Sequence, residues 1–206
     1  MSSLTPNLEN YFCALEKTYT KTCKTYPNSH KALGWASQEA QEKRFEILAQ
    51  IAPLENQTIL DVGCGQGHFL HWLTQHQINT HYIGIDLSLA MVQYTKATYP
   101  HATVIKTNLF NFNQPVDYII ASGVFNNKVD NHLTYLTLAL QHLTKIAKKG
   151  VAFNLLSNKT PPNDQDHHAF TYFSPEALQI HLKNTLPHKV TLKEHYLPND
   201  FTVYLT

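Results

Sequence analysis

Short apolar runs alternate with segments of helical periodicity through the middle of the chain. The apolar runs, which we predict to be buried strands, are residues 58–62, 81–85, 102–106, 116–121 and 151–156. Before the last run, apolar residues step by four and three from Val129 to Ala147, which predicts an amphipathic helix that Gly150 ends. Strands that alternate with helices in this way predict a parallel sheet with helices on both of its faces.

The N-terminal part of the chain has a helical pattern without strands. Apolar residues recur at helical spacing in residues 5–19, and a second helix is predicted from Ser37 until Pro53 ends it. We therefore expect one domain, in which residues 1–52 form a helical cover and residues 53–206 form the α/β core.

The C-terminal part has a third pattern. A helix that begins at Ser174-Pro175 precedes two apolar segments, 189–196 and 201–206, which a short link joins. A link of this length predicts an antiparallel hairpin. The predicted fold class is therefore α/β, with a mostly parallel seven-stranded sheet that ends in a C-terminal antiparallel hairpin.

Composition narrows the classes of partner and location. A net charge of +1 over 206 residues gives no electrostatic case for nucleic acid or membrane as a partner. No apolar stretch approaches the roughly 20 residues of a membrane span, and three cysteines without a CxxC pair favour a reducing setting, so we expect a cytoplasmic protein. Nothing indicates an oligomeric state. The single dense basic cluster is expected to close the long helix, where cations suit the dipole, and consists of Lys145, Lys148 and Lys149.

A glycine-rich loop follows the first predicted strand. Gly63, Gly65 and Gly67 have the spacing GxGxG, with the acid Asp61 just before them. A dinucleotide-binding GxGxxG loop would need a glycine where His68 stands, and no GxxxxGK[ST] phosphate loop is present. The spacing is instead the pattern of S-adenosylmethionine binding.

A second acid supports this interpretation. Asp86 ends the second predicted strand, and an acid at the tip of that strand can bind both ribose hydroxyls. The alternative role for Asp86 is to cap the turn before the next helix, which we predict to begin at the N-cap residue Ser88 and to end near Thr98.

Together, these motifs make residues 58–156 resemble the class I S-adenosylmethionine-dependent methyltransferase family. The resemblance implies a Rossmann-like methyltransferase fold and S-adenosylmethionine as the cofactor. Asn108 stands where an aspartate is commoner in the family, and its amide still offers a donor and an acceptor. The residues that the resemblance, together with the loop, assigns to the cofactor are Trp35, Arg44, Asp61, Gly63, Cys64, Gly65, Gly67, Asp86, Leu87, Asn108, Leu109 and Ser122.

Two of these residues have alternative roles. The planar fork of Arg44 suits the methionine carboxylate of the cofactor, whereas its alternative is a solvated charge on a helix. Trp35 is a cofactor contact or a core aromatic. The resemblance also places Phe125, Asn126 and Asn127 at the substrate mouth, without the [DN]PP[YF] signature of many amino-methyltransferases.

The predicted function is methyl transfer to an unidentified small-molecule acceptor. Candidates for a base or a substrate contact lie after the fifth strand and are His167, His168 and Tyr172, unless this segment is an ordinary polar loop. No metal site is predicted, because adjacent histidines point in different directions. The alternatives are an RNA or protein methyltransferase and a non-catalytic module that binds S-adenosylmethionine.

Overall fold

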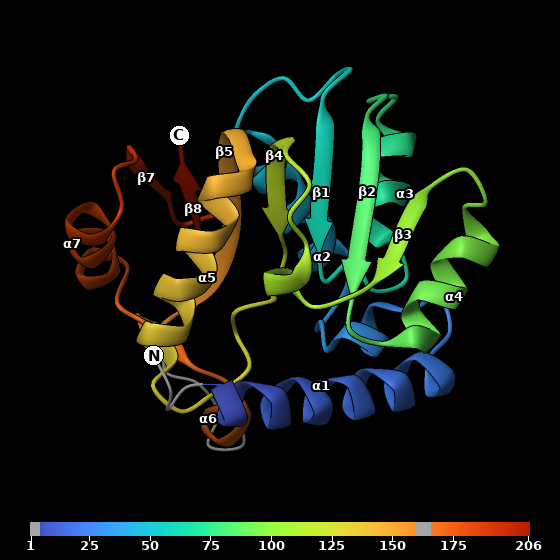
Figure 1. Cartoon of the computed structure of the whole chain (residues 1–206), viewed down its shortest axis with the longest axis horizontal. Helices are drawn as coiled ribbons and strands as arrows, with labels where there is room; N and C mark the ends of the chain where they lie inside the picture. Colours follow the sequence, from blue (N-terminus) through green and yellow to red (C-terminus); the bar gives the residue numbers. More distant parts are fainter. Residues whose placement is uncertain (1–4, 160–165) are drawn as a thin grey trace.

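A computed structural model describes residues 5–159 and 166–206, without the side chains of residues 5–7, 166 and 167 (Figure 1). Its helices are α1 (Thr5–Thr25), η1 (His30–Leu33), α2 (Gln38–Ala49), α3 (His68–Gln75), α4 (Leu89–Thr98), η2 (Leu109–Asn111), α5 (His132–Ile146), α6 (Asp166–Ala169) and α7 (Pro175–Thr185). Its strands are β1 (Thr58–Val62), β2 (His81–Asp86), β3 (Thr103–Lys106), β4 (Val116–Ala121), β5 (Ala147–Ser157), β6 (Tyr172–Phe173), β7 (Val190–Lys193) and β8 (Asp200–Leu205).

The strands form one mixed sheet in the order β3-β2-β1-β4-β5-β8-β7. The first five strands of the chain pair in parallel, whereas β8 is antiparallel to both β5 and β7. Strand order reverses between β1 and β4, which places a crevice at the carboxyl ends of these two strands. The predicted α/β fold class with its C-terminal antiparallel hairpin is confirmed.

Each face of the sheet has its own hydrophobic core. On one face, α5 and α7 cover buried side chains of the central strands, such as Leu60, Ile119 and Phe153. On the other face, α2, α3 and one residue of α4 cover the alternate strand positions, such as Ile59 and Ile120. Side chains of neighbouring residues on a strand point to opposite faces, so the near-continuous apolar runs serve both cores.

Serine side chains cap the first turns of three α-helices. The Oγ atoms of Ser37, Ser88 and Ser174 accept hydrogen bonds from the backbone N–H groups of Ala40, Met91 and Ala177. Each bond satisfies a donor that has no partner within the helix, so these serines fix where α2, α4 and α7 begin. The starts near Ser37, Ser88 and Ser174 agree with those that the sequence predicts.

The boundary between α5 and β5 differs from the prediction. The helix ends at Ile146, and Lys148 and Lys149 lie in β5 instead of closing the helix. Ala147 pairs with Val116 and Gly150 pairs with Tyr118, so hydrogen bonding to β4 outweighs the helical pattern of the sequence. The two-residue strand β6, which pairs with the end of β5, was also not predicted.

The longest helix, α1, lies across the carboxyl-end edge of the sheet, apart from both helical layers (Figure 1). It contacts α4 and η1. Of the helices in the described ranges, none combines the length and apolar character that crossing a bilayer requires.

Candidate active site

A cavity of about 340 Å³ opens between α1 and the carboxyl ends of the parallel strands. Small-molecule sites in proteins have volumes of this order. Residues after β1, β2, β3 and β4 form its floor, and three side chains of α1, Phe12, Leu15 and Tyr19, form its roof. The crevice that the strand order predicts is therefore a cavity with α1 as its roof.

Asp86 joins the glycine loop to the end of β2. Its Oδ2 atom accepts a hydrogen bond from the Gly65 N–H at 2.9 Å, and its Oδ1 atom accepts one from the Ser88 N–H at 2.8 Å. Asp86 lines the cavity, and burial raises its pKa to about 6. Asp86 thus caps the next turn, as the alternative role proposed, and faces the cavity as well.

The structure divides the predicted cofactor residues into three groups. Those that line the main cavity are Trp35, Arg44, Gly63, Asp86, Leu87, Asn108, Leu109 and Ser122. Asp61 and Cys64 line a recess of about 20 Å³, which shares Gly63 and Ser122 with the main cavity. Gly65 and Gly67 line neither space.

Side chains of other elements cover these two glycines. A Cβ atom at Gly65 would lie 2.7 Å from Leu33 of η1, and one at Gly67 would lie 2.8 Å from Thr95 of α4. Gly65 and Gly67 therefore allow the loop to turn and to pack against η1 and α4. Of the three glycines in this loop, Gly63 is the one that lines the cavity.

The amide of Asn108 is partly engaged. Its Oδ1 atom accepts hydrogen bonds from the N–H groups of Phe110 and Asn111, at 2.9 and 3.1 Å, and so caps η2. What Asn108 can offer to a ligand is therefore mainly its Nδ2 donor. Leu109, 4% exposed, adds apolar surface to the same wall.

Arg44 is the most heavily engaged side chain of the site. Its Nε atom donates to Oδ1 of Asp200 at 2.9 Å, its Nη2 donates to Oδ2 of Asp200, and its Nη1 donates to the Ala40 carbonyl. The Arg44 side chain is 7% exposed, so the solvated-charge alternative is wrong. The fork that the sequence analysis offered to a carboxylate ligand is bound by Asp200.

This ion pair belongs to a chain of contacts at the cavity wall. Asn154 donates to Asp200 at 3.1 Å and accepts from the Gly123 N–H at 2.9 Å. The Arg44 guanidinium lies 4.3 Å from the ring centroid of Trp35. The ring in turn lies so near Gly123 that a Cβ atom there would be 2.6 Å from it. Trp35 is thus held in the cavity wall by both neighbours.

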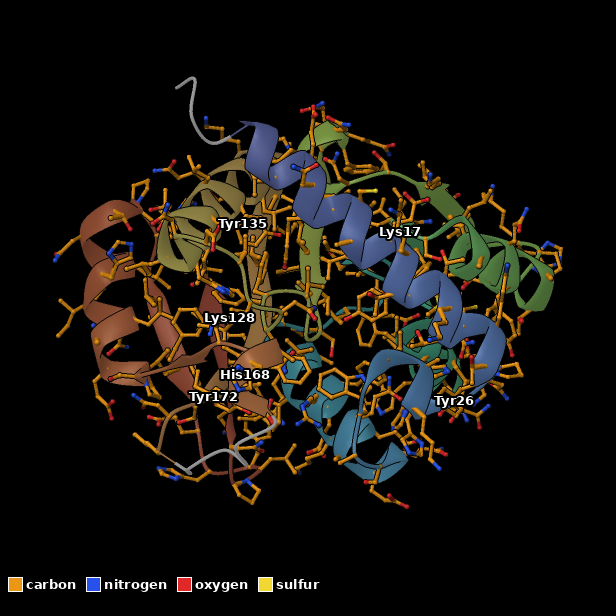
Figure 2. All side chains as sticks on the ribbon, turned by 90° about the horizontal axis from the view of Figure 1, so that it is seen from below. Lys17, Tyr26, Lys128, Tyr135, His168 and Tyr172 are labelled. Atoms are coloured by element: carbon orange, nitrogen blue, oxygen red, sulfur yellow. The ribbon has the colours of Figure 1, made fainter. Side chains whose placement is uncertain are left out.

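The α1 roof is fastened to the loop after β4. Tyr11 donates to the Asn127 carbonyl at 3.2 Å, and Asn127 donates from Nδ2 to the Tyr19 hydroxyl at 3.1 Å. Figure 2 shows α1, with Lys17, on one side of this end of the molecule and Tyr172 and His168 on the other. The helical spacing of Tyr11 and Tyr19 was visible in the sequence, but their partner on a distant loop was not.

The candidates after β5 separate in the structure. Tyr172 lines the cavity, whereas His168 is exposed and does not. The side chain of His167 lies outside the described residues. Phe125, expected at the substrate mouth, is fully buried against Phe153, because its ring completes the core under β4 and β5. Its neighbours Asn126 and Asn127 line the cavity as expected.

Comparison with known proteins gives the family. A methyltransferase domain model matches residues 53–200. Trans-aconitate 2-methyltransferase of Afipia carboxidovorans is 32% identical over 127 residues, which are 60% of this chain and 46% of that protein. A putative methyltransferase of Mycobacterium tuberculosis is 27% identical over 151 residues, which are 71% of this chain and 90% of that protein. The solved DhpI–SAH complex shares the fold, with a TM-score of 0.70 at 12% identity, over 95% of this chain and 96% of that one.

The chain belongs to this methyltransferase domain family, because the matched residues make up most of its length. The resemblance that the glycine loop and Asp86 indicated is thereby confirmed. The helices α1 and α2, which supply the roof and Arg44, precede the matched residues. The chain spans less than half the length of the A. carboxidovorans relative.

Proposed function

We propose that this protein binds S-adenosylmethionine in the cavity under α1 and transfers its methyl group to a small, uncharged acceptor. The observation that carries the proposal is the position of Asp86. This acid lies in the cavity wall, and its carboxylate accepts a hydrogen bond from the backbone N–H of Gly65 in the glycine loop. S-adenosylmethionine supplies a methyl group that its sulfonium already activates. The protein then mainly has to hold the two reactants in line.

The walls after β2 and β3 suit the adenosine part of the cofactor. Each carboxylate oxygen of Asp86 accepts one backbone N–H, which leaves lone pairs for the two ribose hydroxyls. Leu109 offers apolar surface for the adenine ring, and Asn108 offers its Nδ2 donor to a ring nitrogen. The residues present therefore fit the nucleoside.

The remaining walls form the acceptor part, next to Ser122 and Gly123. Its side chains are aromatic, aliphatic or amide-bearing and belong to Asn126, Asn127, Leu156, Phe170, Tyr172 and Asn199. Among the described residues that line the cavity, the charged ones are Asp86 and Arg44. Arg44 is the only arginine of the chain, and Asp200 neutralises it. A polycarboxylate such as trans-aconitate would lack counter-charges here, so we favour an uncharged acceptor.

No histidine lies among the described residues that line the cavity. Tyr172 is the hydroxyl-bearing side chain that we place beside the acceptor, as a hydrogen-bonding group. An acceptor atom that carries a free lone pair at neutral pH needs no general base in the site.

Titration calorimetry with S-adenosylhomocysteine tests the cofactor site. We expect micromolar binding by the wild type and a loss of roughly 10-fold or more in Asp86→Asn, because the variant weakens two hydrogen bonds to a charged group. Affinity should also fall as the pH is lowered through about 6, because protonation of Asp86 removes acceptor lone pairs. Circular dichroism of the variant controls for folding. No binding to the wild type, or binding of NADH instead, contradicts the proposal.

A methyl-acceptor panel tests the second half of the reaction. Mass spectrometry of products should detect methyl transfer to neutral amines or heterocycles and little transfer to trans-aconitate. Preference for trans-aconitate would contradict the uncharged acceptor. Cofactor binding without transfer to any member of the panel would favour the non-catalytic module.

A further inference from the structure

The recess beside the glycine loop contains polar groups without partners. Among the described residues, four buried side-chain atoms lack a hydrogen bond, and two of them, Gln41 Nε2 and Ser122 Oγ, belong to residues that line this recess. A buried polar group without a hydrogen-bond partner destabilises the folded protein. Because the two groups border one small space, a single ligand atom that enters it could bond to both.

Gln41 is held with its amide nitrogen free. The residue is 3% exposed, and its Oε1 atom pairs with Nδ1 of His68 at 3.1 Å. Burial lowers the pKa of His68 to about 4, so this histidine is neutral at pH 7 and Nδ1–H is the donor to Oε1. Gln41 therefore presents an N–H donor to the recess.

The size and position of the recess define which part of a ligand enters. Its volume of about 20 Å³ holds a group the size of a water molecule, and it shares Trp35, Gly63 and Ser122 with the main cavity. Two donors at this depth suit an oxygen of an anion. Asp61 lines the same recess. A ligand that carries an ammonium group next to its own carboxylate would offset the negative charge of Asp61.

We propose that Gln41 and Ser122 are the receptors for the carboxylate of the cofactor's methionine end, in place of Arg44. The inference rests on the proposed function, because the cofactor is the ligand in question. Arg44 is the obvious alternative receptor, but both of its fork nitrogens that face Asp200 are already bound. Gln41 Nε2 and Ser122 Oγ, in contrast, have no partner and border the recess at this end of the cavity.

The test compares two ligands that differ only in the carboxylate: S-adenosylhomocysteine and its decarboxylated form, measured by titration calorimetry. Ser122→Ala removes an oxygen that has no partner, so its free energy of unfolding should not fall. We expect affinity for S-adenosylhomocysteine to drop roughly 10-fold in Ser122→Ala. Affinity for the decarboxylated ligand should stay within about 2-fold.

Two further variants sharpen the result. Gln41→Glu keeps the oxygen that His68 needs but replaces the donor with an acidic oxygen, so it should also weaken only the carboxylate ligand. Ser157→Ala is the matched control: Ser157 is buried outside both spaces, and its Oγ accepts from the Lys159 N–H. It should lower stability and leave both affinities unchanged.

The outcomes separate the two proposals. If the wild type binds neither ligand, the proposed function fails. If it binds S-adenosylhomocysteine, but Ser122→Ala and Gln41→Glu weaken both ligands equally or neither, the carboxylate receptor is wrong and the cofactor site stands.

Discussion

Gly123 is the residue at which the site depends most on the absence of a side chain. Its φ is +73°, and a Cβ atom there would lie 2.6 Å from the Trp35 ring. Gly34 has a similar φ of +77° but no atom within 4 Å of a Cβ position, so the two glycines form a matched pair. Alanine at Gly34 should cost only the left-handed backbone strain, about 1–2 kcal/mol.

Gly123→Ala should cost more, by about 1–3 kcal/mol for the collision with the ring. Urea unfolding of both variants measures the difference. In a Trp35→Ala background, the excess cost of Gly123→Ala should disappear. Equal costs for the two alanine variants in the wild-type background would mean that Trp35 does not rest on Gly123.

At the residue scale, local motifs in the sequence located the nucleoside half of the site. The turn after β1 and the acid after β2 depend on neighbours in sequence, so Gly63 and Asp86 were predictable. Asp200 and Gln41 were not assigned, because their importance depends on partners 156 and 27 residues away. Arg44 was named for its chemistry, but the side chain that neutralises it lies on the last strand.

The helix α1 is the element whose behaviour depends most directly on a ligand. Phe12, Leu15 and Tyr19 line the cavity from one face of α1, and hydrogen bonds of Tyr11 and Tyr19 tie the helix to Asn127 after β4. A bound cofactor would fill the space under this face and add contacts. We therefore expect S-adenosylhomocysteine to slow hydrogen exchange of the α1 amides.

The helix α7 provides the control within the same experiment, because none of its residues lines the cavity. Exchange measured by mass spectrometry, with and without the ligand, should show slowing in α1 and little change in α7. Equal slowing in both helices would indicate a general gain in stability and would argue against α1 as a roof.

At the scale of elements, the sequence predicted types better than ends. The starts of α2, α4 and α7 were readable, because a serine cap acts through bonds to its own neighbours. The end of α5 was not readable, because Ala147 to Gly150 pair with β4, which is distant in sequence. The same reason hid β6, whose two residues are a strand only through their pairing with β5.

At the scale of the whole molecule, α2 in the N-terminal part of the chain is joined to β8, the last strand. Arg44 and Asp200 form a buried ion pair between α2 and β8, and the Tyr204 hydroxyl donates to the Ile47 carbonyl at 2.5 Å. The segment that precedes the family match is therefore anchored to the C-terminal hairpin. The sequence pattern predicted both parts, but nothing in it predicted that they meet.

A double-mutant cycle measures this connection. Arg44→Met leaves the Asp200 carboxylate buried without its cation and should lower the free energy of unfolding by about 3–5 kcal/mol. Asp200→Asn leaves the Arg44 guanidinium without a counter-charge but keeps a side-chain oxygen that can accept the hydrogen bond from Asn154. The double variant should be less destabilised than Arg44→Met alone, because no uncompensated charge remains. Urea unfolding of all four proteins gives the coupling.

The same double variant tests which part of the site recognises the cofactor. If Arg44 serves to hold Trp35 and the hairpin, the folded double variant should keep its preference for S-adenosylhomocysteine over the decarboxylated ligand. If that preference disappears while Ser122→Ala leaves it intact, the guanidinium is the carboxylate receptor despite its pairing with Asp200.

The stability measurements have their own contrary outcome. If the costs of Arg44→Met and Asp200→Asn add up in the double variant, the two side chains do not depend on each other. The anchoring of α2 to β8 would then rest on Tyr204 and apolar packing.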